Sequence, residues 1–118
     1  MKLGLALVIA TDLARAEAFY GGVLGLVPKQ RTTQHLVFAA GPVDLTIFQG
    51  TADAPPARHG ETAATVFVFE VPYLDATIAD LKAKGVPFLH TTPATGPLGR
   101  YAAFRDPFGN VLELLERG

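Results

Sequence analysis

The sequence predicts an α+β fold in which two βαβββ modules form an eight-stranded curved sheet, a cup with the helices on its outer face. A strand, a helix and a helix-ending glycine occur in the same order twice, and three strand-like runs follow each copy. A Pro-, Ala- and Gly-rich segment without periodicity, residues 51–61, separates the copies. We therefore expect a single domain, 1–118, whose modules 1–50 and 62–118 are joined by this linker.

The first module opens with an apolar run, Leu3–Ala10, that is typical of a buried strand. A signal peptide is the alternative interpretation, because a positive residue precedes the run and Ala-Arg-Ala follows it. The strand is favoured, because the run ends at Asp12 and Arg15 lies inside the supposed cleavage motif. A helix should begin near Asp12, with a last turn weakened by Gly21 and Gly22. Three further strands are expected at Pro28–Thr33, His35–Ala40 and Asp44–Phe48.

The second module repeats this order, with a strand at Thr65–Val71 and a helix over residues 73–85. Leu74, Ile78 and Leu81 recur at the spacing of one helix face, which predicts that this face packs on the sheet. An Asp-Pro-Phe-Gly-Asn turn should connect the last two strands. The strands after this helix are expected at Phe88–Thr91, Tyr101–Phe104 and Val111–Leu115.

Composition excludes several kinds of function. The net charge is −1 and the basic residues are scattered, so neither a nucleic acid nor a membrane surface is an expected partner. The absence of cysteine excludes disulfides and thiolate metal sites. The absence of serine excludes a Ser-His-Asp triad, and no catalytic residue stands out. With the N-terminal run interpreted as a strand, the expected location is cytoplasmic.

One residue of the last strand conflicts with its surroundings. Glu113 lies between Val111 and Leu115 on one face of that strand, and a carboxylate among apolar neighbours is costly unless it is paired. Arg31, Arg100 and His35 are the candidate partners, and water is the alternative. His59 falls in the linker and is expected to be a solvated loop residue.

Two stretches resemble a known family. DLARAEAFYGGVLGL resembles the first-helix signature of the vicinal oxygen chelate superfamily, and FRDPFGNVLELLE resembles its C-terminal hairpin. That superfamily includes glyoxalase I, extradiol dioxygenases and bleomycin resistance proteins. The resemblance implies the paired βαβββ fold, usually assembled as a homodimer. Fold alone does not give function, so the site is considered separately.

In metal-dependent members of this superfamily, four strand positions supply the ligands. By their spacing from the shared motifs they fall on Leu5, Thr46, Val66 and Glu113. Leucine and valine cannot coordinate a cation, whereas such sites need about three or four N, O or S ligands. We therefore expect no metal and no other cofactor.

The resemblance and the missing ligands together imply a metal-free small-molecule-binding protein, similar in logic to bleomycin resistance proteins, that sequesters a small planar or aromatic compound in an apolar cup. One alternative is a metal-dependent lyase, isomerase or oxygenase with relocated ligands, such as His35, His90 and Glu113. Another is a protein-interaction module whose cup is filled by its own side chains. The expected ligand-binding residues are Leu5, Leu7, His35, Phe38, Thr46, Phe48, Val66, Arg100, Tyr101, Phe108 and Glu113.

Overall fold

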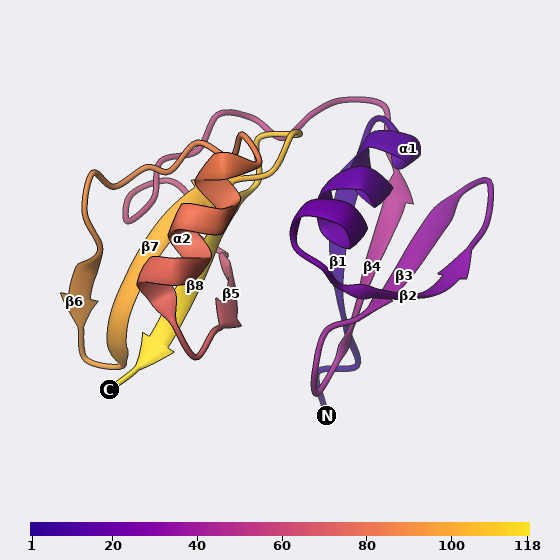
Figure 1. Ribbon diagram of the computed structural model, residues 1–118. Coiled ribbons are helices and arrows are strands. Elements are labelled where there is room, and N and C mark those ends of the chain that lie inside the picture. The colour runs from indigo at the N-terminus through magenta and orange to yellow at the C-terminus, as the bar shows by residue number, and fades with distance from the viewer. The chain divides into compact units, whose positions relative to one another are not determined.

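The computed structural model describes residues 1–118 as two compact units, Met1–Ala54 and Pro55–Gly118. Each unit has a four-stranded sheet with a helical segment against one face, which is the expected α+β repeat (Figure 1). The first unit contains β1 (Leu5–Ala10), α1 (Leu13–Ala16), η1 (Glu17–Val23), β2 (Val27–Arg31), β3 (His35–Ala39) and β4 (Asp44–Gln49). The second contains β5 (Phe67–Glu70), α2 (Leu74–Ala83), β6 (Ala94–Gly96), β7 (Gly99–Arg105) and β8 (Val111–Arg117).

The sheet of the first unit has the strand order β1-β4-β3-β2, with β1 parallel to β4 and the other pairs antiparallel. Side chains on alternate residues of β1, β3 and β4 are buried beneath α1 and η1, whereas β2 is exposed along its whole length. Val8, Leu45, Ile47, Leu36 and Phe38 form this core. The other alternate residues point to the face without a helix, which we call the open face of the sheet.

The first helical segment begins where the sequence predicts and then changes its winding. The Asp12 side chain caps it by accepting a hydrogen bond from the Arg15 backbone N–H at 3.1 Å. After Ala16 the chain continues as a π-helix, and Leu24 N–H donates to the Phe19 carbonyl at 2.9 Å. The glycine pair expected to weaken the last turn lies in this wider segment, and Gly21 packs directly on the Phe38 ring.

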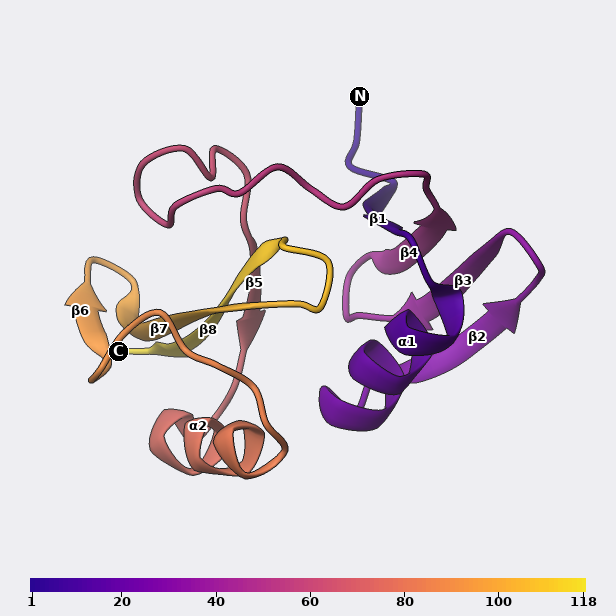
Figure 2. The ribbon, with the colours of Figure 1, turned by 90° about the horizontal axis from the view of Figure 1, so that it is seen from above.

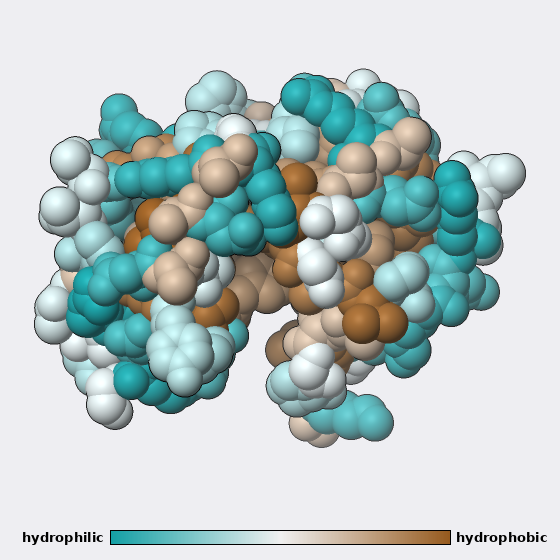
Figure 3. Space-filling model, viewed as in Figure 1, coloured by the Kyte–Doolittle hydropathy of each residue, from teal (hydrophilic) through white to brown (hydrophobic).

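The sheet of the second unit has the equivalent order β5-β8-β7-β6, with β5 parallel to β8. The helix α2 covers one face and buries Leu74 and Leu81 there, as the periodicity predicts. Leu112, Leu114 and Phe104 are the sheet residues of this core. Because β8 lies between β5 and β7, its side chains occupy the middle of both faces. The outward surface of α2 mixes hydrophilic residues with alanines (Figure 3).

The segment that precedes β5 lies on the side of the sheet opposite α2 (Figure 2). Its turn is held by three backbone hydrogen bonds to the Arg58 carbonyl, from the N–H groups of residues 61–63. Arg105 on β7 donates to the Ala57 carbonyl at 2.6 Å and so fixes the segment to the sheet. Residues 55–61, expected to be a free linker, are therefore part of the second unit.

One predicted strand is wrong. Phe88–Thr91 forms no strand, and only Phe88 makes an isolated antiparallel bridge, to Phe104. The strand beside β7 is β6, three residues further along the chain, where Ala94 lies opposite Tyr101. The Pro93 ring cannot donate a ladder hydrogen bond, so regular pairing begins only after it. None of the helices has the length and apolar character needed to cross a membrane.

Candidate functional site

The open face of the first sheet is apolar and accessible to solvent. Leu5, Leu7 and Ile9 point outward from β1 and retain 49%, 46% and 44% of their surface. Thr46 lies opposite Leu7 on the neighbouring strand and is buried. Exposed aliphatic side chains are unfavourable in water. An apolar partner that covered this face would bury them, and this burial would favour its binding.

Aromatic rings extend this face toward β3. Phe48 is exposed, and its ring stacks on the His35 ring with centroids 5.1 Å apart. The His35 ring is also held by Thr32 Oγ1 at 3.0 Å and by Gln30 Oε1 at 3.3 Å. His35 lies opposite Phe48, and Phe48 lies opposite Ile9, so both rings are on the open face with Leu7. Their role in ligand binding stays a prediction.

The open face of the second sheet contains the titratable groups. Val68 and Ala103 lie opposite Glu113 on the two strands that flank β8, and Tyr101 lies opposite Leu115. Val68 is exposed, whereas Leu115 is buried although it points to this face. The segment that precedes β5 passes over this side of the sheet, as Figure 2 shows.

The partner of Glu113 is His59. The His59 Nε2 atom lies 2.8 Å from Glu113 Oε2, and the two side chains keep 19% and 17% of their surface. The expectation that His59 is a solvated loop residue is therefore wrong. The reason is a long-range contact: the segment is tied down by Arg105, which brings this histidine onto the sheet.

Two further rings surround this pair. The His59 ring centroid lies 5.2 Å from that of His90 and 6.0 Å from that of Tyr101, and the His90 and Tyr101 centroids lie 5.7 Å apart. The His90 ring lies at the edge of β7, where its Nδ1 accepts a hydrogen bond from the Ala103 backbone N–H at 3.2 Å. We call Glu113, His59, His90 and Tyr101 the ring cluster.

The protonation of His90 follows from this placement. Its Nδ1 accepts a hydrogen bond, so in the neutral ring the proton is on Nε2. Burial lowers the pKa of His90, and the neighbouring His59 lowers it further, against an opposing effect of the Glu113 carboxylate. The neutral ring with an Nε2–H donor is therefore the form that the fold favours.

Two of the predicted partners of Glu113 make ion pairs within their own units. Arg31 pairs with Glu17 at 3.4 Å. Arg100 points to the helix side of its sheet, where it makes a two-pronged contact with Asp75 at 2.8 and 3.2 Å. Adjacent strand residues point to opposite faces, so Arg100 cannot share a face with Tyr101. The expectation that Arg100 pairs with Glu113 is therefore wrong.

Two expected aromatic walls are core residues. Phe38 is buried under η1, and Phe108 is buried in the turn between β7 and β8. That turn is organised by Asp106, whose Oδ1 accepts from the N–H groups of Phe108 and Asn110, each at 2.9 Å. Neither ring is exposed to solvent. Val66 precedes β5 and is half-buried.

The donor set does not fit the metal of the resembled superfamily. Leu5 and Thr46 lie in the first unit, and Val66 and Glu113 in the second. Two of these four positions are hydrocarbons, and the Glu113 carboxylate is hydrogen-bonded to an imidazole. No group of three or more His, Asp or Glu side chains within either unit is arranged to hold an ion.

A family model supports the assignment that the repeat and the open faces suggest. Residues 2–114 match the model described as the Glyoxalase/Bleomycin resistance protein/Dioxygenase superfamily. The chain belongs to this superfamily. No curated protein sequence is significantly similar to it.

Solved structures agree with this glyoxalase-superfamily fold. A lactoylglutathione lyase from Agrobacterium tumefaciens is 30% identical, with a TM-score of 0.74 over 98% of this chain and 92% of that one. The fosfomycin resistance protein FosX from Listeria monocytogenes, solved with Mn(II) and sulfate, is 18% identical with a TM-score of 0.82 over 99% and 90%. The antibiotic-binding protein TnmS3 from Streptomyces sp. CB03234 is 23% identical with a TM-score of 0.76 over 100% and 97%.

Sequence reasoning missed His59 and gave His90 only as a relocated ligand. Part of the site was nevertheless readable. A tight turn at residues 106–110 pairs Arg105 with Val111, so strand alternation places Tyr101 and Ala103 beside Glu113. No local pattern identifies His59, because it contacts the sheet 54 positions before Glu113.

Proposed function

We propose that the chain is a metal-free binding protein of the glyoxalase superfamily that sequesters a small planar or aromatic compound on its open faces. The chemistry of the inherited ligand positions carries the proposal. Leu5 and Val66 cannot coordinate a cation, and Glu113 is engaged by His59. A site that has lost these ligands retains an apolar surface, which binds ligands by burial and hydrogen bonding.

The exposed side chains on the first sheet support this role. Leu5, Leu7 and Ile9 could each bury further surface against a ligand, at about 25 cal/mol for each Å² of apolar area. The stacked His35 and Phe48 rings offer a flat neighbour to a planar compound. TnmS3, described as an antibiotic-binding protein, provides a binding precedent on this fold.

A second candidate is a metal-dependent lyase, isomerase or oxygenase with relocated ligands. The observation in its favour is the 30% identity to a lactoylglutathione lyase. Metal content separates the two candidates. The purified protein should contain far less than one metal ion per chain by plasma mass spectrometry, before and after mild chelation. Stoichiometric, tightly held metal would overturn the metal-free proposal.

The binding role is tested by a thermal-shift screen of planar aromatic compounds and antibiotics. A compound present at a hundred times its Kd should stabilise the protein by about 2.7 kcal/mol. Leu7→Glu places a carboxylate on the open face and should abolish the shift. The matched control is Leu3→Glu, because Leu3 is exposed and precedes β1. If no compound shifts the wild type, the binding role is wrong.

A further inference from the structure

The ring cluster contains polar atoms that the fold itself does not use. His59 Nε2 bonds Glu113 Oε2, and His90 Nδ1 bonds the Ala103 N–H. The Tyr101 hydroxyl and His90 Nε2 have no hydrogen-bond partner in the chain. No buried side-chain nitrogen or oxygen lacks a partner, so these two atoms are in contact with solvent. They are therefore accessible to a ligand.

Donors and an acceptor occur together in this cluster. His90 presents an Nε2–H that its backbone hydrogen bond fixes as a donor, and Tyr101 presents an O–H. Glu113 keeps lone pairs beyond the one that His59 occupies, so it can accept a further hydrogen bond. The three ring centroids are 5.2 to 6.0 Å apart, within the range of aromatic contacts.

We propose that the ring cluster binds the hydroxyl group of a phenolic ligand, an inference that rests on the proposed binding function. The phenol O–H donates to Glu113, and its oxygen accepts from His90 Nε2–H or the Tyr101 O–H. The exposed Val68 side chain, which lies opposite Glu113 on β5, borders the ring of the ligand. A hydroxyl is the group that suits this arrangement, because it both donates and accepts. A hydrocarbon ring without oxygen leaves all three groups unpaired.

The test compares 2-naphthol with naphthalene, which share the fused ring and differ by one hydroxyl. Affinities are measured by fluorescence titration on the full chain. Wild type should bind 2-naphthol more tightly than naphthalene. Tyr101→Phe and His90→Gln should each weaken 2-naphthol binding roughly three- to tenfold, the effect of one lost hydrogen bond, and leave naphthalene binding unchanged.

The matched control is Tyr73→Phe, which removes the hydroxyl of an exposed tyrosine in the same unit. It should change neither affinity, and circular dichroism should show that every variant is folded. As a second measurement, 2-naphthol should shift the histidine ring resonances of His90 in nitrogen-15 spectra, and naphthalene should leave them in place.

Equal binding of the two probes, or unchanged 2-naphthol affinity in both variants, would overturn the inference while leaving a binding function intact. Failure of both probes to bind would also overturn it. The proposed function itself is overturned only if the compound screen described above finds no ligand. The two failures are thus distinguishable.

Discussion

Glu113 shows how a single side chain depends on a distant part of the chain. Its carboxylate lies on a strand between Val111 and Leu115, both buried, where an unpaired charge would be costly. His59, which lies 54 positions earlier in the sequence, offsets this cost by its hydrogen bond to the Glu113 carboxylate. Hydrogen bonds to an ionised group contribute about 1.5 to 3 kcal/mol, so this contact helps to hold residues 55–61 on the sheet.

His90 predicts how stability depends on pH. Its pKa is lowered in the folded state by burial and by His59, so the unfolded chain binds a proton more readily. Above the ordinary value of 6.5 both states are neutral at this residue, and its contribution to stability is complete. As the pH falls below that value, the unfolded state gains protons first. The free energy of unfolding should therefore decrease between pH 7.5 and 5.5.

The measurement is thermal unfolding across that pH range, for wild type and His90→Gln. Glutamine can still accept the Ala103 N–H hydrogen bond but does not titrate, so the variant should show a weaker pH dependence. His35→Gln is the matched control on the other sheet. Identical pH profiles for wild type and His90→Gln would contradict the placement of this ring.

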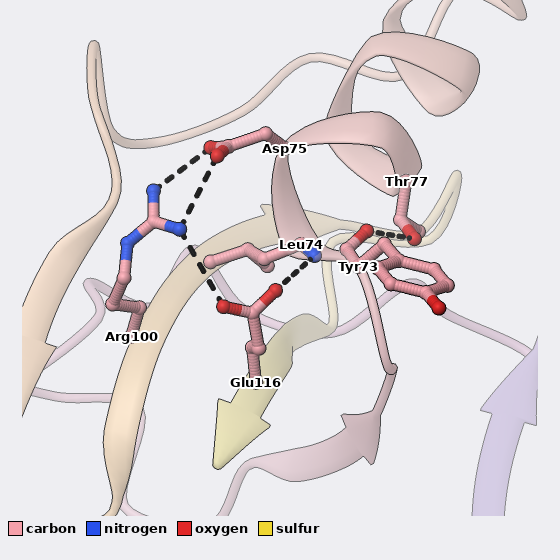
Figure 4. A network of polar contacts seen from close by, with 6 residues as sticks. All are labelled: Tyr73, Leu74, Asp75, Thr77, Arg100 and Glu116. Carbon is pink, nitrogen blue, oxygen red and sulfur yellow. Dashed lines mark hydrogen bonds and ion pairs between the residues drawn. The ribbon is translucent and has the colours of Figure 1, made fainter. Parts of the chain in front are cut away.

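At the scale of elements, α2 receives its cap from another strand. Its first N–H groups lack a local acceptor, because the Tyr73 side chain makes no capping bond. Glu116 on β8 supplies one, and its Oε2 accepts from the Leu74 N–H at 2.7 Å (Figure 4). Arg100 links the same carboxylate to Asp75 in the first turn of the helix. A carboxylate at a helix N-terminus also interacts favourably with the helix dipole.

Glu116→Ala should destabilise the protein by about 0.5 to 2 kcal/mol, because it removes this cap. Urea unfolding monitored by circular dichroism measures the change. Glu70→Ala is the control: Glu70 pairs with Arg117 at the exposed end of the sheet and should matter much less. Equal losses in the two variants would show that Glu116 acts only as a surface ion-pair partner.

Most elements could be predicted because their signals are local. The four strands of the first unit and the start of α2 follow from short-range periodicity, and agree with β1–β4 and α2 within about two residues. The strand that was not predicted, β6, did not follow from a local pattern. Phe88–Thr91 has strand-like residues, but the edge of β7 pairs regularly only with Ala94–Gly96. Which segment pairs with the edge of a sheet depends on the neighbouring strand, and the β-propensity of the segment itself does not describe this.

The site was harder to predict than the fold. Outward positions such as Leu5 and Leu7 followed from alternation and from the resemblance, and the structure places them on an open face. Arg100 was assigned by proximity in sequence, and strand alternation turned it to the other side. His59 required knowledge of how a loop folds back over a sheet. Long-range contacts of loops cannot be inferred from the local pattern of a single sequence.

At the scale of the whole molecule, the two units share a strand order but differ in their chemistry. The first presents exposed leucine and isoleucine on its open face, and the second presents the ring cluster. Such exposed apolar surface is uncommon in an isolated chain. We propose, in line with the expectation from the superfamily, that the protein is a homodimer.

A homodimer should have twice the 12.5 kDa mass of one chain in size-exclusion chromatography with light scattering. The edge strands are the physical reason, since the free edges of β2 and β6 have backbone groups that can pair with another copy. The mass should be stable on dilution through the micromolar range. A mass of one chain at these concentrations would contradict the proposal.

The position of β8 has a consequence for how the protein is made. This strand is the last of its unit in chain order, yet it lies between β5 and β7 and supplies both Glu113 and the Glu116 cap. During synthesis on the ribosome, β5 and β7 cannot complete their sheet, and α2 cannot complete its packing, until residues 111–117 emerge. The first unit waits in the same way for β4, which lies between β1 and β3, but β4 is complete well before β8 is synthesised. A chain whose synthesis stops before β8 therefore leaves the apolar side chains of β5 and β7 without their shared neighbour, which makes it a substrate for chaperones and proteases.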